Sequence, residues 1–145
     1  MFALAVRTAA FAILVMLNAG ARAQQPPPVA DENLTLRDHH FKLSAPVPGG
    51  RSTWHVRNEG TEPHQALIVQ LPEGVHEYAE RAWFTSGSRG DEPGRPVGGV
   101  PQLEPGRDAW FTVTLEPGRY LLLCTMTEDE GRHFDLGMIY RFTIE

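Results

Sequence analysis

Four residues of this 145-residue chain carry side chains that together could bind a soft metal ion: His64, Cys124, His133 and Met138. Because Cys124 is the one cysteine, an intramolecular disulfide and a zinc ribbon are both excluded. One thiolate and two imidazoles in a trigonal arrangement, with a weak thioether above them, suit copper cycling between Cu(I) and Cu(II). The combination therefore predicts one mononuclear copper ion held by these four residues.

Each of these residues also has an ordinary structural explanation when it is taken alone. Cys124 and Met138 could simply be buried apolar side chains. His64 follows a proline and could belong to a surface turn, and His133 could be solvated in an acidic loop. It is the combination of the four that favours a metal site.

The other histidines receive no predicted role. His39 and His40 could form a weak surface metal site, but adjacent residues of a strand point to opposite faces. His55 and His76 are interpreted as outward-facing polar residues.

Hydrophobic periodicity predicts the elements that must position these residues. Strands are expected where apolar residues alternate or form short runs between turns, at residues 34–37, 40–43, 53–58, 65–71, 108–115, 120–126 and 138–144. In the third of these, Trp54 and Val56 should face inward. Short strands with turns about every ten residues predict an all-β fold, a Greek-key β-sandwich, with a closed barrel as the alternative.

One short inserted helix is predicted among the strands. Between residues 75 and 84 the apolar side chains recur at helical spacing, which places on one face Val75, Tyr78, Ala79, Ala82 and Trp83. We expect that face to pack against the sandwich. Residues 86–101 are rich in glycine and proline without periodicity, so they are predicted to form a long surface loop.

A β-sandwich can bring the four candidate ligands together at one of its ends. The starts and ends of neighbouring antiparallel strands meet at the same pole, so His64 at a strand start can lie beside Cys124 at a strand end. Residues 125–137 would then fold back over that pole and deliver His133 and Met138.

Three stretches of the sequence resemble motifs of the cupredoxins, the small blue copper proteins. NEGTEPHQALIV is similar to the family's Asn, turn, Pro-His and apolar strand, and LEPGRYLLLC is similar to its Pro-Gly-x-Tyr-x-x-x-Cys strand. HFDLGM is similar to the family's His followed by a later Gly-Met. The resemblance covers residues 53–145. It implies a cupredoxin-like fold and a type 1 copper site with imidazole ligands His64 and His133, thiolate ligand Cys124 and axial ligand Met138.

The sequence departs from the cupredoxin pattern in two places. In the family, the residue after the first ligand His often hydrogen-bonds near the cysteine sulfur and is usually Asn or Ser, whereas here it is Gln65. Eight residues, 125–132, separate Cys124 from His133, where the family has a shorter link. This insertion predicts a mobile loop that tethers His133 loosely. Its acidic residues either hang near the copper or point into solvent: Glu128, Asp129 and Glu130.

The N-terminal residues have the pattern of an export signal. Arg7 precedes an apolar run at residues 8–17, and Ala21-Arg22-Ala23 gives a small-x-small cleavage pattern. That run is shorter than the roughly 20 apolar residues of a membrane-spanning helix. We therefore expect a signal peptide at 1–23, cleaved near Ala23, a flexible lead-in at 24–33 and one cupredoxin-like domain at 34–145. The protein would be periplasmic or secreted, without a membrane anchor.

Three functions are compatible with these residues. The leading hypothesis is a one-electron carrier with no substrate chemistry of its own, and the alternatives are a copper carrier or buffer and a metal-free cupredoxin-like binding module. No catalytic triad, phosphate loop or second metal cluster is recognisable in the sequence, so an enzyme is not expected. A net charge of −5 without a basic stripe argues against nucleic-acid binding. We expect a monomer whose partner is a redox or copper-exchange protein.

Overall fold

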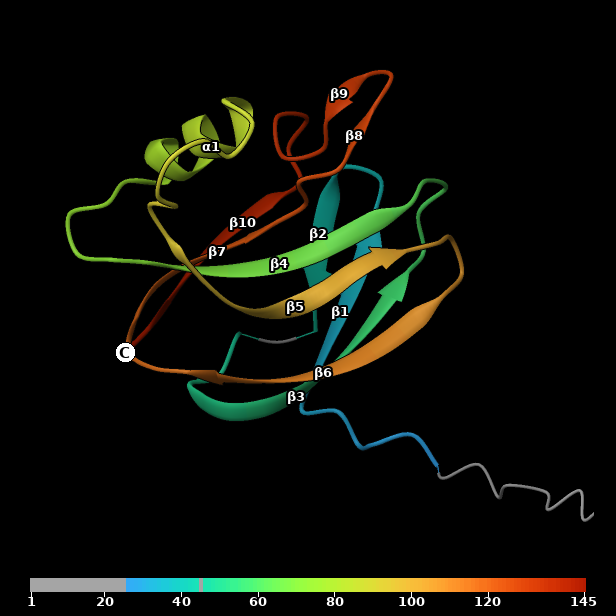
Figure 1. Cartoon of the computed structure of the whole chain (residues 1–145). Coiled ribbons are helices and arrows are strands. Elements are labelled where there is room, and N and C mark those ends of the chain that lie inside the picture. Colours follow the sequence, from blue (N-terminus) through green and yellow to red (C-terminus); the bar gives the residue numbers. More distant parts are fainter. Residues whose placement is uncertain (1–25, 45) are drawn as a thin grey trace, which may run out of the picture.

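The structure, a computed structural model, describes residues 26–44 and 46–145 (Figure 1). The predicted signal peptide therefore lies outside the described residues, as does the start of the predicted lead-in. The described part of the chain forms ten strands and one helix. In that part, no helix is both long enough and apolar enough to cross a membrane.

The first sheet has four strands in the order β2-β1-β3-β6. Their bounds are His40–Leu43 for β2, Glu32–Arg37 for β1, Gly50–Asn58 for β3 and Asp108–Leu115 for β6. β1 begins two residues earlier than predicted, and it runs parallel to β3, while the other two pairings are antiparallel. A turn of two residues, Asp38 and His39, joins β1 to β2.

The second sheet has four antiparallel strands in the order β10-β7-β4-β5. Their bounds are Ile139–Ile144 for β10, Gly118–Leu123 for β7, His64–Leu71 for β4 and Arg95–Leu103 for β5. A small hairpin, β8 (Thr127–Glu128) with β9 (Gly131–Arg132), forms a sheet of its own. The predicted two-sheet β-sandwich with one short helix is confirmed, and the sheets do not join into one closed barrel.

Apolar side chains of both sheets fill the space between them. As predicted, Trp54 and Val56 of β3 face inward, and both are fully buried. Leu122 of β7 is equally buried, and Cys124 and Met138 belong to the same core cluster. The candidate ligands at these two positions are therefore continuous with the core.

β5 corrects the prediction of a surface loop over residues 86–101, because its first seven residues lie in that range. Four of the glycines and prolines that suggested a loop occupy an irregular strand, whose pairing with β4 shifts register twice: Pro96, Gly98, Gly99 and Pro101. At Gly99, whose φ is +137°, a Cβ atom would lie 2.0 Å from the carbonyl oxygen of Ala66. Glycine here permits a close approach of two paired strands.

The helix α1 spans Glu77–Thr85, close to the predicted position, but three of the five residues on the predicted buried face are exposed. Tyr78 is 65% exposed and Ala79 and Ala82 are exposed, whereas Glu80 is fully buried. Phe84 packs on the outer side of the second sheet beside Phe134, and Val75, which precedes the helix, packs against the same buried cluster. Figure 1 shows α1 lying along this side of the molecule. Periodicity alone could not identify the face, because a buried carboxyl group takes one of its positions.

The buried carboxyl group of Glu80 ties α1 to the segment that leads into β5. Its Oε2 accepts a hydrogen bond of 2.7 Å from the backbone N–H of Gly94. Its Oε1 and the Oε1 of Glu92 are both buried and have no hydrogen-bond partner within residues 26–44 and 46–145. Burial, together with the neighbouring Glu92, raises the pKa of Glu80 from its ordinary 4.5 to about 7.

This environment predicts that the contribution of Glu80 to the stability of the fold decreases as the pH rises. A carboxyl group whose pKa is raised by folding contributes full stability below about pH 4.5 and loses that contribution as the pH rises through about 7. Glu80→Gln is neutral at every pH, and its amide can still accept from Gly94. The free energy of unfolding of the variant should therefore exceed that of the wild type at pH 8, and the difference should vanish near pH 4.5.

Urea denaturation of the metal-free protein between pH 4.5 and 8 measures this effect. Glu73→Gln, at an exposed carboxyl group, is the matched control and should follow the wild-type profile. Parallel pH profiles of the wild type and Glu80→Gln would show that Glu80 is ionised in the folded protein.

Candidate metal centre

The pairing of β4 with β7 places His64 beside Cys124. His64 is the first residue of β4, and Cys124 directly follows the last residue of β7. The two strands are antiparallel neighbours, so the start of one meets the end of the other. The backbone N–H of Gln65 donates a 3.3 Å hydrogen bond to the Cys124 sulfur. This is the meeting at one pole that the sequence predicts.

Backbone hydrogen bonds fold the following segment back over this pole. The N–H of His133 donates to the carbonyl of Met126 at 2.9 Å, and the N–H of Phe134 donates to that of Cys124 at 3.1 Å. Met138 donates to the carbonyl of His133 at 2.8 Å, and its own carbonyl accepts from the Cys124 N–H at 3.2 Å. The backbone positions of Cys124, His133 and Met138 are thus fixed relative to one another.

Three ligand atoms converge in a buried pocket at this pole. The Nδ1 atoms of His64 and His133 lie 3.1 Å apart, and the Cys124 sulfur lies 3.5 Å from the His133 Nδ1. All three side chains are fully buried. An ion about 2.0–2.1 Å from each nitrogen and about 2.3 Å from the sulfur would hold such atoms roughly 3.3–3.8 Å apart. The sulfur–nitrogen separation of 3.5 Å falls in this range, and the nitrogen–nitrogen separation of 3.1 Å lies slightly below it. A small outward movement of the two rings would let all three atoms bind one ion.

Met138 completes the group that the sequence predicts. Its side chain is fully buried in the same core cluster as the Cys124 side chain. The backbone hydrogen bonds described above bring it beside both Cys124 and His133. A thioether at such a position can serve as the weak axial ligand of a type 1 copper site.

The electrostatics of the pocket favour neutral ligands before any ion binds. Burial raises the pKa of the Cys124 thiol, and backbone N–H groups of Gln65 and Met126 offset only part of this effect. Burial, together with the neighbouring His64, lowers the pKa of His133. The pocket therefore offers a His133 ring that favours its neutral form and a thiol that must lose its proton when it binds a metal.

A carboxylate behind His64 sets the orientation of that ring. Asp38 Oδ1 lies 3.0 Å from the His64 Nε2, and Asp38 also accepts hydrogen bonds from the hydroxyl and the N–H of Thr61. Burial alone would raise the pKa of Asp38, but the hydrogen bonds from His64, Thr61 and Glu62 outweigh it and lower the pKa to about 2. An ionised carboxylate can only accept, so the His64 Nε2 carries the proton and its Nδ1 lone pair faces the pocket.

The unusual residue Gln65 also has a defined role. Besides its backbone donation to the sulfur, its side-chain Oε1 accepts from the Thr125 hydroxyl at 2.7 Å and from the Thr125 N–H at 3.3 Å. The longer side chain therefore connects β4 to the residue after Cys124. This contact fixes the start of the inserted segment.

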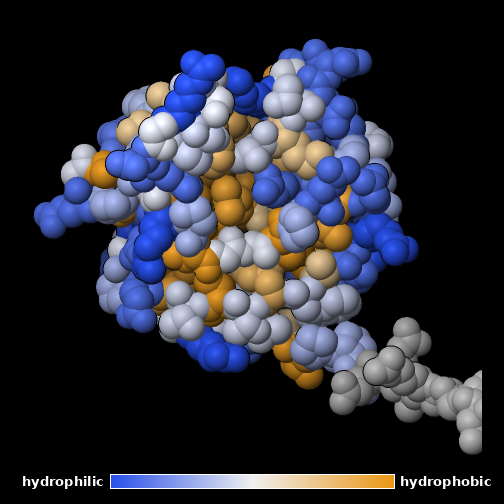
Figure 2. All heavy atoms as spheres, viewed as in Figure 1, coloured by the Kyte–Doolittle hydropathy of each residue, from blue (hydrophilic) through white to orange (hydrophobic). Residues whose placement is uncertain are grey.

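The inserted segment forms the β8–β9 hairpin, which projects from the molecule in Figure 1. Its acidic residues are exposed at the tip, where Figure 2 shows a hydrophilic surface: Glu128, Asp129 and Glu130. Of the two predicted alternatives, the structure favours carboxylates that point into solvent. The backbone of His133 is hydrogen-bonded to Met126 at the base of the hairpin, and the mobility expected of the inserted segment stays a prediction.

The second ring nitrogen of His133 faces two residues that the sequence reasoning did not select. Its Nε2 lies 3.5 Å from the Oε2 of Glu62, and the rings of His133 and His39 have centroids 5.4 Å apart. His39 lies in the β1–β2 turn with a φ of 62°, so the argument that adjacent strand residues point to opposite faces does not apply to it. The sequence signal for Asp38, His39 and Glu62 is weak, because each reaches the pole through a contact distant in sequence.

The histidines at positions 55 and 76 have structural surroundings, in line with the prediction. His55 lies 3.0 Å from the Asp108 carboxylate and stacks on Trp110. His76 stacks on Tyr78 at the surface.

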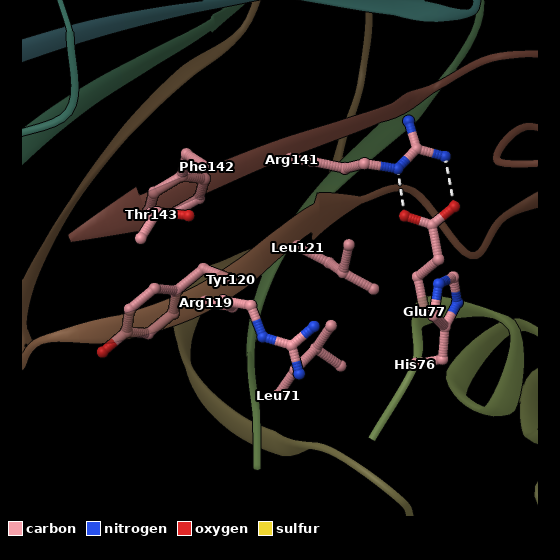
Figure 3. Close-up of a pocket in the computed structure, with 9 residues that line it drawn as sticks. All are labelled: Leu71, His76, Glu77, Arg119, Tyr120, Leu121, Arg141, Phe142 and Thr143. Atoms are coloured by element: carbon pink, nitrogen blue, oxygen red, sulfur yellow. Dashed lines mark hydrogen bonds and ion pairs between the residues drawn. The ribbon is translucent and has the colours of Figure 1, made fainter. Parts of the chain in front are cut away.

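A surface pocket at the other end of the second sheet is separate from this centre (Figure 3). It is lined by Leu71 at the end of β4 and Arg119 near the start of β7, whereas the ligands lie at the opposite ends of these strands. Figure 3 shows Arg141 of β10 paired with Glu77 of α1 at its edge. The pairing attaches the helix to the sheet and offers no metal ligand set.

Comparison with known proteins identifies the fold. No family model and no curated protein sequence matches the chain. Similar solved structures include an auracyanin from the photosynthetic bacterium Roseiflexus castenholzii, with 20% identity, a TM-score of 0.57 and coverage of 78% of this chain and 94% of that chain. Auracyanin A, a "blue" copper protein from Chloroflexus aurantiacus, has 16% identity, a TM-score of 0.52 and coverage of 78% and 99%.

An azurin from the obligate methylotroph Methylomonas sp. strain J gives a similar result, with 17% identity, a TM-score of 0.51 and coverage of 78% of this chain and 95% of that chain. At these identities the likeness concerns the fold. The chain therefore has the cupredoxin fold that its three sequence motifs imply.

Proposed function

We propose that this chain binds one copper ion at His64, Cys124, His133 and Met138 and acts as an exported one-electron carrier. The observation that carries the proposal is the convergence of two imidazole Nδ1 atoms and one thiol sulfur in a fully buried pocket. Zinc and softer ions would also accept these donors, but a thiolate with two imidazoles and a thioether is the set typical of blue copper sites. The similarity to a "blue" copper protein supports this choice.

The chain supplies rigidity to such a centre. Copper bound there would supply a reversible exchange of one electron. The Asp38 carboxylate holds the His64 ring, the Gln65 N–H holds the Cys124 sulfur, and backbone hydrogen bonds hold His133. Ligands fixed in this way keep their positions when the charge of the ion changes, which favours fast electron exchange with a redox partner protein.

The hairpin insertion is compatible with this function because its two ends are close together, so that Cys124 and His133 are joined by a short path at its base. The hydrogen bond between the His133 N–H and the Met126 carbonyl closes the hairpin, so residues 127–132 extend away from the base between these two residues. At the base, only Thr125 separates Cys124 from Met126, which forms the closing hydrogen bond with His133. The second imidazole is thus delivered as it would be by a much shorter link.

The first prediction concerns the thiolate. Apo protein titrated with Cu(II) should develop an intense thiolate-to-copper charge-transfer band that saturates at one equivalent. Cys124→Ser should abolish this band because a hydroxyl oxygen is a poor ligand for copper of this type, while the similar volume of serine preserves the fold. His76→Ala, at a surface histidine, should keep the wild-type band.

Visible absorption and far-ultraviolet circular dichroism measure both parts of this prediction. A colourless wild-type complex would refute the type 1 site and favour a metal-free binding module. An unchanged band in Cys124→Ser would place the copper elsewhere.

The second prediction concerns the axial position. Met138→Leu nearly conserves side-chain volume but removes the thioether donor, which stabilises Cu(II) more than Cu(I). The variant should keep the charge-transfer band, and its reduction potential should rise. Met126→Leu is the matched control, since Met126 packs against the same core cluster without being a candidate ligand. Equal potentials for both variants in voltammetry would show that Met138 is a core residue only.

The third prediction tests the base of the hairpin. Replacing residues 127–132 by Asn-Gly would leave two residues between Met126 and His133, the length of a type I′ turn. The hydrogen bond between Met126 and His133 can then close the turn itself. We expect the charge-transfer band and the copper stoichiometry to be retained, as measured by absorption. Loss of the band in a folded variant would mean that the inserted residues shape the site directly.

A further inference from the structure

A second group of potential ligands lies on the outer side of His133. The ligand atoms of His39, Glu62 and His133 all lie within 4.8 Å of one another, and we call these three residues the outer cluster. The candidate copper ligands use the Nδ1 of His133, whereas Glu62 faces its Nε2. One ring orientation of His133 can therefore serve both groups.

The outer cluster contains polar atoms that lack partners. The His133 Nε2 and the Glu62 Oε2 are both buried, and neither forms a hydrogen bond to any described residue. The Asp38 carboxylate behind His64 differs, because its oxygens already accept from His64, Thr61 and the Glu62 N–H. Buried polar atoms without partners are rare and costly, which points to a ligand at the outer cluster rather than at Asp38.

The outer cluster also lies between the buried pocket and solvent. The side chains of His39 and Glu62 are 28% and 34% exposed, whereas the His64 and His133 side chains are fully buried. An ion that approaches His133 from this side meets His39 and Glu62 first. Two imidazoles and a carboxylate are donors that suit hydrated Cu(II), whereas the thiolate of the inner site also suits Cu(I).

We propose that the outer cluster is a loading position, at which His39, Glu62 and His133 capture Cu(II) before it reaches the inner site. The inference rests on the proposed function of the inner site. A neutral imidazole has one lone pair to give. His133 therefore binds at Nε2 or at Nδ1, and the two positions hold one ion in turn.

Transfer to the inner site needs no redox partner. The bonds from copper to His39, to Glu62 and to the Nε2 of His133 break, and bonds to His64 Nδ1, to His133 Nδ1 and to the Cys124 sulfur form. The ring proton of His133 moves from Nδ1 to Nε2 by exchange with water. The S–H bond of Cys124 breaks, and its proton leaves to water. The copper stays divalent throughout, so electrons balance without an oxidant or a reductant.

The β1–β2 turn positions the outer cluster. It consists of Asp38 and His39, and it brings one side chain to each ligand histidine: Asp38 to His64, and His39 to His133. His39 has a φ of 62°, a conformation that Asn and His adopt more readily than most residues. His39→Asn therefore removes the imidazole with little backbone cost.

Loading kinetics test the proposal directly. Apo protein is mixed with one equivalent of Cu(II), and the growth of the charge-transfer band is followed by stopped flow. His39→Asn and Glu62→Gln should slow the growth by about tenfold or more, the effect typical of losing a supporting ligand, while the final band stays unchanged. His40→Ala is the matched control, because it alters the exposed neighbouring histidine, and it should load at the wild-type rate.

Zinc binding isolates the outer position. In Cys124→Ala the inner thiolate is gone, and calorimetry with Zn²⁺ should detect one bound ion. Adding His39→Asn or Glu62→Gln to this variant should weaken that binding by about tenfold or more.

The outcomes separate this inference from the proposed function. Absence of the band in wild-type protein overturns the function itself. A normal wild-type band with unchanged loading rates in His39→Asn and Glu62→Gln overturns the loading position alone. A zinc affinity of Cys124→Ala that neither His39→Asn nor Glu62→Gln changes would also overturn the loading position alone.

Discussion

The register between β4 and β7 is the constraint on which the metal centre depends. Leu67 pairs with Leu123, which brings the first residues of β4 beside Cys124 at the end of β7. Along β7, residues 120 and 122 face the core between the sheets, whereas residues 121 and 123 face the side of α1. Cys124 continues the inward set. Because side chains alternate along a strand, a slip of one residue would turn the sulfur away from both imidazoles.

The first sheet contributes to the centre through one turn. Asp38 and His39 belong to the hairpin of β1 and β2, and they lie against ligands that come from the second sheet and the segment after it. The Asp38 carboxylate also accepts hydrogen bonds from Thr61 in the loop before β4. One ionised group of the β1–β2 turn therefore contacts both this loop and the His64 ring of the second sheet. The centre is therefore a contact between the two sheets as well as a ligand set. Its geometry should depend on how the whole sandwich packs.

The features that could be predicted from the sequence are those set by residues close to one another along the chain. The positions of Cys124 and Met138 in the core follow from local patterns, since strand alternation and residue type both indicate them. The buried face of α1 does not follow, because a Glu80 carboxyl group with a raised pKa replaces an apolar residue there. β5 was hidden by glycines whose close approach to β4 becomes visible only once the strands are paired. The residues behind the ligands come from turns distant in sequence, where no periodicity marks them.

The proposed electron transfer and the proposed copper loading place opposite demands on the same residues, and these demands fall on two different sides of His133. On the inner side, the ligands are buried and backbone hydrogen bonds fix their positions, which favours a constant geometry for two charge states. On the outer side, Glu62 and His39 are half-buried, and polar atoms lie near one another without hydrogen bonds. The side-chain movement that copper loading needs can then be confined to Glu62 and His39, which do not fix the positions of His64 and Cys124. The proposed rigid carrier and the proposed loading position are therefore compatible in one small sandwich, provided that the shared His133 imidazole keeps its orientation.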